Sequence, residues 1–265
     1  MHEIELLVDL HKGADRQGPG GDAETVKAID LAGLDRDVPL SIADIGCGTG
    51  ASALVLARLL NARIIAVDFL QEFLDVLSGR ARRAGMDDKI IPLCASMERL
   101  PFESEAFDVI WSEGAIYNIG YGKGLADWRR FLKPGGLLVA SEITWLTTSR
   151  PPQIQNYWDN QYPEIDTAST KVKMLEENGY SPIGYFVLPE HCWLANYYDP
   201  MRSSMSAFLN RHRGSEKARD IIEAERREIE LYLNYKAYFG YGVYVARKLD
   251  GAYSLPDVSE YRQGS

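Results

Sequence analysis

From Ile42 onward, short apolar runs alternate along the chain with segments of helical periodicity. This alternation is typical of an α/β fold with a mainly parallel sheet, because two parallel strands are joined by a crossover that usually contains a helix. We predict strands at 41–46, 62–68, 89–95, 107–113 and 136–143, and helices between them at 51–61, 70–85 and 125–132. Such a chain should place helices on both faces of its sheet.

The alternation weakens beyond Trp145. Residues 150–166 are rich in proline and aromatic residues and predict a long ordered loop or a short cap. A helix is predicted at 167–180 and two further strands at 181–189 and 239–249. The segment between these two strands contains a long charged helix near 215–235 and is too long for a structureless loop, so it predicts a helical and aromatic cap.

The first residues stand apart from this pattern. A Gly-Pro-Gly turn precedes a predicted helix at 23–34. We therefore expect an N-terminal helical lid over residues 1–36 and a main domain over 37–250. The main domain carries the cap as an insertion at about 190–238, and residues 251–265 form a C-terminal tail.

Composition excludes several classes of partner. The 265 residues carry a net charge of -9 with no basic footprint, so we expect no nucleic-acid partner. No apolar run approaches the ~18 residues of a membrane span, so we expect no membrane partner. The three cysteines lie far apart, which favours reduced thiols in the cytoplasm, and no metal site is expected because no pair has ligand spacing.

The segment "DIGCGTG" at 44–50 follows the first predicted strand directly. Its three glycines allow the backbone to turn sharply and to pass close to a ligand. Asp68 ends the second predicted strand, twenty residues after Gly48. A carboxylate at this place can accept hydrogen bonds from both hydroxyls of a ribose, so the pattern predicts a nucleoside site.

The glycine spacing bears on which nucleoside binds. It reads G-x-G-x-G, one residue shorter than the G-x-G-x-x-G of dinucleotide sites. Asp44 precedes Gly46 by two positions, where an acid suits a cation better than a pyrophosphate. The pattern favours a ligand with a positive amino-acid end. A nicotinamide-dependent oxidoreductase and a non-catalytic cofactor-binding module stay open as alternatives.

Four motifs carry a resemblance to a known family: "ADIGCGTG", "AVD", "CASMERLPFESEAFDVIWSEGAIYNI" and "FLKPGGLLVASE". Over about 40–143, their order and spacing resemble those of class I S-adenosylmethionine-dependent methyltransferases that act on small molecules. The resemblance implies S-adenosylmethionine as cofactor and methyl transfer to a small-molecule acceptor by in-line displacement. It also implies a Rossmann-like sheet of seven mostly parallel strands, the last one antiparallel.

The resemblance implies roles for individual residues. Gly46, Cys47, Gly48 and Gly50 would border the methionine part, Asp44 its positive end, and Asp68 with Phe69 the ribose. Ser96 and Met97 would flank the adenine, although many relatives have aspartate where this chain has Ser96. Glu113 and Gly114 would lie beside the sulfonium. The segment "RQGPGG" at 16–21 resembles a cofactor-covering segment, so Gln17 is predicted to contact the cofactor and Arg16 the substrate.

Candidates for the acceptor side follow from position and chemistry. Tyr117 and Asn118 lie just past the fourth predicted strand, and His191 begins the cap. We predict Tyr117 and His191 as catalytic residues, rank His11 below His191, and predict Asn118, Tyr157 and Trp193 as substrate contacts. For the aromatic residues, packing is an equal alternative to attraction of a cationic acceptor. The long cap helix would close the pocket or form a homodimer interface.

Overall fold

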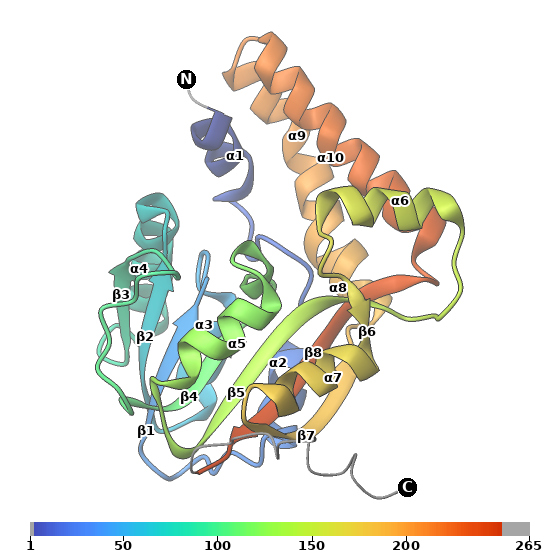
Figure 1. Cartoon of the computed structure of the whole chain (residues 1–265). Helices are drawn as coiled ribbons and strands as arrows, with labels where there is room; N and C mark the ends of the chain where they lie inside the picture. The colour runs from blue at the N-terminus through green and yellow to red at the C-terminus, as the bar shows by residue number, and fades with distance from the viewer. Residues whose placement is uncertain (1–2, 251–265) are drawn as a thin grey trace, which may run out of the picture.

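The computed structural model describes residues 3–250. Its centre is an eight-stranded sheet in the order β3-β2-β1-β4-β5-β8-β7, with the short strand β6 paired to β5 (Figure 1). The strands are β1 Leu40–Ile45, β2 Ala62–Asp68, β3 Ile90–Cys94, β4 Phe107–Ser112, β5 Leu132–Trp145, β6 Asp166–Thr167, β7 Tyr180–Val187 and β8 Phe239–Lys248. In the described sheet, only β8 runs in the direction opposite to that of the other strands. The mostly parallel sheet with an antiparallel last strand is therefore confirmed, and the two-residue β6 is an addition.

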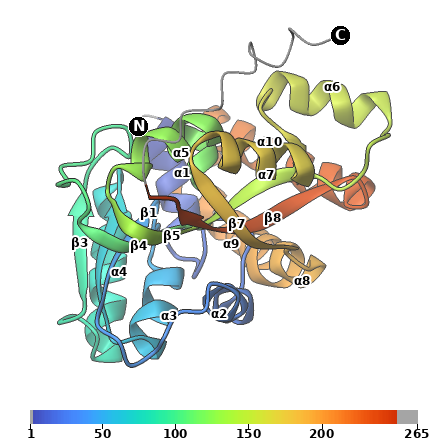
Figure 2. The same ribbon diagram turned by 60° about the horizontal axis from the view of Figure 1, so that its bottom comes forward.

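Helices cover both faces of the sheet, as Figure 2 shows. One face carries α2 Asp22–Leu31, α3 Ala51–Leu59 and α4 Gln71–Ala84, and the other carries α5 Tyr121–Arg129 and α7 Ala168–Glu177. Each face has its own cluster of buried apolar side chains. α3 is apolar nearly all round because it is buried against the sheet, whereas α4 buries a single stripe that includes Phe73 and Leu77.

The remaining helices lie around the carboxyl ends of the strands. α1 Glu3–His11 contacts α9 Asp199–Arg211 and α10 Glu216–Tyr235 (Figure 1). The short α8 Glu190–Trp193 and a π-helical turn, Leu194–Tyr198, lead into α9. Asp9 of α1 accepts hydrogen bonds from Arg211 at 2.8 Å and His212 at 3.0 Å, so α1 is fixed to the end of α9.

Two helices differ from the sequence-based expectation. The range 150–166 contains α6 Pro152–Gln161, which begins at a proline. Proline suits the first turn of a helix, so it marked a helix start there and not a loop. The helix expected at 125–132 is α5, which begins at Tyr121 and ends at Arg129, because Leu132 pairs with Phe107 in the sheet. Two glycines in the first turn of α5 hid its start.

The strand register positions the site. β1 pairs with β2 on one side and β4 on the other, so the strand order reverses at β1. Ile45 lies opposite Val67, which places the glycine turn and Asp68 at the same edge. Ligands of open parallel sheets bind beyond such an edge. Across residues 3–250, none of the helices combines the length and the apolar composition that a membrane span needs. The expected tail at 251–265 lies outside the described residues.

Candidate functional site

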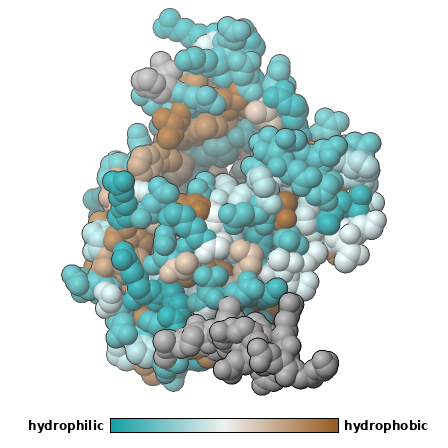
Figure 3. All heavy atoms as spheres, in the orientation of Figure 1, coloured by the Kyte–Doolittle hydropathy of each residue, from teal (hydrophilic) through white to brown (hydrophobic). Residues whose placement is uncertain are grey.

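A cavity of about 680 Å³ lies beyond the carboxyl ends of β1, β2 and β4. Its volume falls within the roughly 300–1,000 Å³ of small-molecule sites. In the space-filling view, apolar surface gathers at the level of α1, above a hollow over the ends of the central strands (Figure 3). Three exposed apolar side chains of the chain, Ile4, Phe69 and Tyr117, line this cavity. Such exposed apolar side chains around a concave site are typical of ligand binding.

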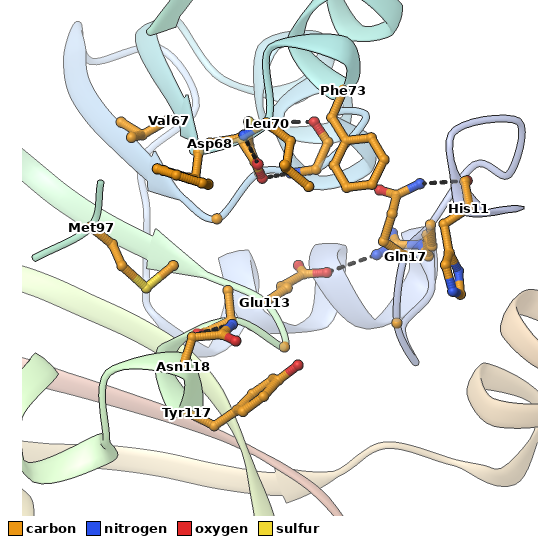
Figure 4. A pocket seen from close by; sticks show the side chains of 18 of the residues that line it. His11, Gln17, Val67, Asp68, Leu70, Phe73, Met97, Glu113, Tyr117 and Asn118 are labelled. Carbon is orange, nitrogen blue, oxygen red and sulfur yellow. Dashed lines mark hydrogen bonds and ion pairs between the residues drawn. The ribbon is translucent and has the colours of Figure 1, made fainter. Parts of the chain in front are cut away.

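Thirteen of the predicted site residues line the cavity: Arg16, Gln17, Gly46, Cys47, Gly48, Asp68, Phe69, Ser96, Met97, Glu113, Gly114, Tyr117 and Asn118. Five lie elsewhere: Asp44, Gly50, Tyr157, His191 and Trp193. Figure 4 shows how the labelled side chains are distributed. Val67 and Met97 lie on one side of the open space, His11 and Gln17 on the other, and Glu113 between them.

The glycine turn is held by the end of β2. The amides of Gly46 and Cys47 both donate to the carbonyl of Val67, at 2.8 and 2.9 Å. The φ angles of Gly46, Gly48 and Gly50 are +77°, +54° and +87°, which favour glycine. A Cβ on Gly46 would lie 2.2 Å from the Cβ of Ala115. The turn therefore needs glycine both for its backbone and for its close approach to the segment after β4.

Asp68 is fixed by backbone amides of the turn and of its own strand end. Its Oδ2 accepts from the amide of Gly48 and its Oδ1 from that of Leu70, both at 2.9 Å. Burial raises the pKa of Asp68, and these hydrogen bonds oppose that change. Each oxygen accepts only one of these bonds and keeps further acceptor capacity. The carboxylate is thus a preorganised acceptor for a pair of hydroxyls.

The segment 12–21 between α1 and α2, hereafter the strap, crosses the glycine turn. The Gln17 Oε1 accepts from the amide of Thr49 at 2.8 Å, and its Nε2 donates to the Ala14 carbonyl at 3.2 Å. A dinucleotide would place its pyrophosphate against the amides at the start of α3. Because Gln17 already occupies the Thr49 amide, the strap argues against this mode of binding.

Arg16 joins the strap to the end of β4. Its Nη1 donates to Glu113 Oε2 at 2.8 Å, and Glu113 Oε1 accepts from Thr25 and Trp111 at 2.7 and 2.9 Å. Burial lowers the pKa of the Arg16 guanidinium, but the Glu113 and Asp22 carboxylates together outweigh this effect and the pKa is raised. Arg16 is 9% exposed, so this ion pair is largely shielded from water. Arg16 and Glu113 line the cavity while each is engaged by the other.

The other side of the cavity gathers groups suited to an acceptor. Tyr117 and Asn118 come from the turn after β4, and Tyr197 comes from the cap. His11 of α1 also lines the cavity, and its Nε2 lies 3.2 Å from Glu225 Oε1 on α10. Burial and the Glu228 carboxylate raise the pKa of Tyr117. Its phenol therefore stays protonated at neutral pH and can donate a hydrogen bond.

His11 and the apolar residues of α1 were not predicted as site residues. α1 ends long before the first strand, and His11 and Glu225 are separated by 214 positions. α1 buries Leu6, Val8 and Leu10, and neither this helix nor its partners were predicted from the sequence. No local pattern could therefore bring His11 to the cavity.

The predicted residues outside the cavity have other partners. His191 is 53% exposed, and its Nε2 lies 3.3 Å from Glu24. The Trp193 ring stacks on Tyr232 with centroids 4.3 Å apart, and Tyr157 packs edge-on against Trp158. Gly50 makes room for Leu77. Packing, and not contact with a ligand in this cavity, therefore accounts for Tyr157 and Trp193. His191 also lies outside the cavity.

Residues 42–136 match a family described as a methyltransferase domain. A demethylmenaquinone methyltransferase of Clavibacter sepedonicus is 33% identical over 52% of this chain and 53% of its own length. The chain thus spans about half the length of the curated relatives it matches. The residues that match the family model contain the glycine turn, Asp68 and the cavity wall after β4.

Solved structures extend the similarity to nearly the whole fold. A methyltransferase of Geobacter sulfurreducens, solved with S-adenosyl-L-homocysteine, superposes with a TM-score of 0.80 over 91% of this chain and 97% of its own, at 17% identity. The [4+2]-cyclase SpnF superposes with a TM-score of 0.74 over 94% and 93%, at 20% identity. Identities this low show a shared fold, and a cyclase among the neighbours means that the reaction must be argued from the site.

Proposed function

We infer that this chain is a member of the class I S-adenosylmethionine-dependent methyltransferases, and we propose that it methylates a small molecule by in-line displacement. One observation carries the proposal. Within the matching residues 42–136, the glycine turn and Asp68 form a preorganised cradle for a nucleoside at the switch point of the sheet. The strap occupies the place that a pyrophosphate would need, so the nicotinamide alternative is not favoured.

The residues present fit S-adenosylmethionine. We propose that Asp68 accepts hydrogen bonds from the ribose hydroxyls through the capacity that Gly48 and Leu70 leave free. Ser96 and Met97 border the adenine end, where the Trp128 Nε1 donates to the Met97 carbonyl at 3.1 Å and fixes that segment. Gly46, Cys47 and Gly48 border the methionine part, and the strap residue Gln17 covers it. When bound, the cofactor supplies an electrophilic methyl group on a sulfonium.

The chain itself supplies orientation, exclusion of water and a proton acceptor. We propose that Tyr117 and Asn118 orient the acceptor, with the Tyr117 phenol as hydrogen-bond donor. We propose that His11 takes the proton of an acceptor that arrives protonated, such as a phenol, an alcohol or an ammonium. Glu225, paired with His11 Nε2, orients the ring. Burial raises the pKa of the Cys47 thiol well above its usual value, which makes Cys47 a neutral wall residue.

The size of the acceptor, the cellular compartment and the oligomeric state are further parts of the proposal. A small-molecule acceptor fits the cavity of about 680 Å³. The cytoplasm fits the cysteines Cys47, Cys94 and Cys192, which are free thiols. A homodimer stays a prediction, to be checked by light scattering. In the described chain, α10 buries Ile221, Ile222, Ile229 and Tyr232 against its own protomer and exposes Leu233.

Calorimetric titration tests the cofactor part directly. The wild type should bind S-adenosylmethionine and S-adenosylhomocysteine with micromolar affinity but not NAD⁺. Asp68→Ala should weaken this binding at least tenfold, because about 1.5–3 kcal/mol is lost for each hydrogen bond to a charged acceptor. Asp127→Ala, an exposed aspartate on α5, is the control and should bind as the wild type does. Binding of NAD⁺ alone would overturn the proposal.

The acceptor part is tested once a screened acceptor turns over. His11→Asn should lower kcat by roughly 100-fold for an acceptor with a protonated nucleophile, since general bases contribute about that much or more. Its affinity for S-adenosylhomocysteine should stay within about twofold of the wild type. The control is Asp127→Ala, an exposed substitution on α5 outside the cavity, which should keep kcat. A full kcat in His11→Asn would remove His11 from the mechanism, and binding without any turnover would favour the non-catalytic module.

A further inference from the structure

Outside the cavity, three potential metal-binding side chains from distant parts of the chain converge. Glu24 lies on α2, and His191 and Cys192 lie on α8. The Glu24 Oε1 is 3.3 Å from His191 Nε2, and the Cys192 Sγ is 3.7 Å from the same nitrogen. The three ligand atoms all lie within 4.8 Å of one another. The proposed methyl-transfer site uses none of these side chains.

The spacing agrees with a tetrahedral metal centre. Zinc is bound at about 2.0–2.2 Å by nitrogen and oxygen and at about 2.3 Å by sulfur, so its ligand atoms are separated by about 3.3–3.6 Å. The two measured separations, 3.3 and 3.7 Å, are close to these values. The third separation, between Glu24 and Cys192, is at most 4.8 Å, so an ion among the three atoms would draw these two side chains together by up to about 1 Å.

The burial and the chemistry of these three side chains also favour a bound metal ion. Cys192 is fully buried, and Glu24 Oε2 is buried with no hydrogen-bond partner among residues 3–250. A buried carboxylate oxygen without a partner is costly, and a cation would satisfy it. His191 is 53% exposed, which leaves an entry path and a place for a water molecule as fourth ligand. A set of one thiolate, one imidazole and one carboxylate suits Zn²⁺. It does not suit Mg²⁺ or Ca²⁺, because both ions prefer ligands that are all oxygen.

We propose that Glu24, His191 and Cys192 bind a divalent transition-metal ion of the zinc type, which clamps α2 to α8. On binding, the Cys192 thiol releases its proton to solvent and its thiolate sulfur bonds to the ion, without any change of oxidation state. Sequence spacing could not show this site, because Glu24 and His191 belong to the lid and the cap.

The clamp would act on the strap, which ends next to α2. The strap is already tied to the cap at this place, since the Asn196 Nδ2 donates to the Gly20 carbonyl at 2.7 Å and the Gly20 amide to the Cys192 carbonyl at 3.4 Å. Thr25, one residue after Glu24, donates to Glu113 in the wall of the cavity. A metal ion at this site would hold the strap in place at its C-terminal end.

The test uses the full chain, reduced and stripped of metal, titrated with Zn²⁺ against a chromogenic chelator and with Co²⁺ alone. We expect one ion per chain, a thiolate-to-Co²⁺ charge-transfer band in the near ultraviolet, and a higher thermal midpoint with Zn²⁺. His191→Asn should weaken Zn²⁺ binding at least tenfold, and its exposed position leaves the fold intact. Cys192→Ser should remove the charge-transfer band.

Matched controls separate this site from other thiols and imidazoles. Cys94→Ser, at an exposed cysteine, and His212→Asn, at the far end of α9, should keep the affinity, the stoichiometry and the band. The proposal is overturned if the wild type gives no thiolate band, or if His191→Asn binds Zn²⁺ as tightly as the wild type. Neither result bears on the binding of S-adenosylhomocysteine, so failure here is distinguishable from failure of the proposed function.

Discussion

Asp44 lies behind the glycine turn, fully buried and away from the cavity. Its Oδ2 accepts from Ser52 Oγ at 2.7 Å, and its Oδ1 has no partner among the described residues. Burial raises the pKa of Asp44 to about 7, with the Ser52 hydrogen bond acting in the opposite direction. The sequence placed this acid at the positive end of the cofactor, but the fold directs it beneath the start of α3.

This burial makes stability depend on pH. Between about pH 4 and pH 7, the folded state keeps the Asp44 proton while the unfolded chain loses it, so the free energy of unfolding falls as pH rises. In Asp44→Asn this contribution is absent. We expect the loss of unfolding free energy between pH 5 and pH 8 to be smaller in the variant, by on the order of 1–3 kcal/mol. Urea unfolding at both pH values measures it, and identical losses in the two proteins would contradict the pKa assignment.

The surroundings of Gly48 lead to a second prediction about stability. A Cβ there would lie 2.3 Å from Gln17 Oε1, at a φ of +54°. Gly33 has a similar φ of +65° with open space around it, so Gly33→Ala measures the backbone strain alone. We expect Gly48→Ala to cost about 0.5–1.5 kcal/mol more than Gly33→Ala, because the end of the Gln17 side chain must move and give up its hydrogen bond with the Thr49 amide.

The excess should disappear when Gln17→Ala is combined with Gly48→Ala, since the clashing side chain is then absent. Unfolding free energies from urea titration measure all these differences. Equal costs for the two glycine substitutions would show that the strap moves aside without resistance, and would weaken its assignment as a fixed cover.

At the scale of the element, the strap depends on its ion pair with β4. Removing Arg16 leaves Glu113, whose side chain is 17% exposed, beside Thr25 and Trp111 without a counter-charge. Breaking a buried pair typically costs about 3–5 kcal/mol, whereas an exposed pair contributes about 0–1 kcal/mol. Arg16→Met should therefore destabilise the protein by about 3 kcal/mol and weaken S-adenosylhomocysteine binding at least tenfold.

Arg58→Met is the matched control for this prediction. Arg58 also pairs with Asp22, but its side chain is 51% exposed. We expect a change within about 1 kcal/mol and no effect on ligand affinity. If both variants lose equal stability in urea unfolding, or if Arg16→Met binds the ligand normally, the strap does not hold the cavity closed in the way proposed.

At the scale of the whole molecule, the cavity joins α1, the strap, the sheet and the cap. A ligand that binds only this assembled state stabilises all of it. At a concentration 100 times its dissociation constant, S-adenosylhomocysteine should add about 2.7 kcal/mol and raise the thermal midpoint by roughly 5 °C. NAD⁺ at the same concentration is the control and should leave the midpoint unchanged. A shift with NAD⁺ and none with S-adenosylhomocysteine would contradict the assignment.

Much of the central fold could be predicted from local patterns. Strands β1 to β5 and helices α3 and α4 lie close to their expected ranges. The spacing of apolar residues within a few positions shows both the type of element and the face that it buries. The start of α6 was misjudged because its prolines resembled a loop, although proline also suits the first turn of a helix. The start of α5 was misjudged because its first turn contains two glycines.

The sequence by itself determined the part of the cavity that we propose binds the nucleoside. Gly46, Gly48 and Asp68 lie at the ends of adjacent parallel strands, so a short motif and the strand order are enough to bring them together. Only the tertiary structure decided the rest. It brings His11 to Glu225 across 214 positions and Arg16 to Glu113 across 97 positions. It also places His191, which the sequence predicts at the cavity, next to Glu24. Contacts of such range depend on how the lid and the cap pack on the sheet, and no local pattern encodes that packing.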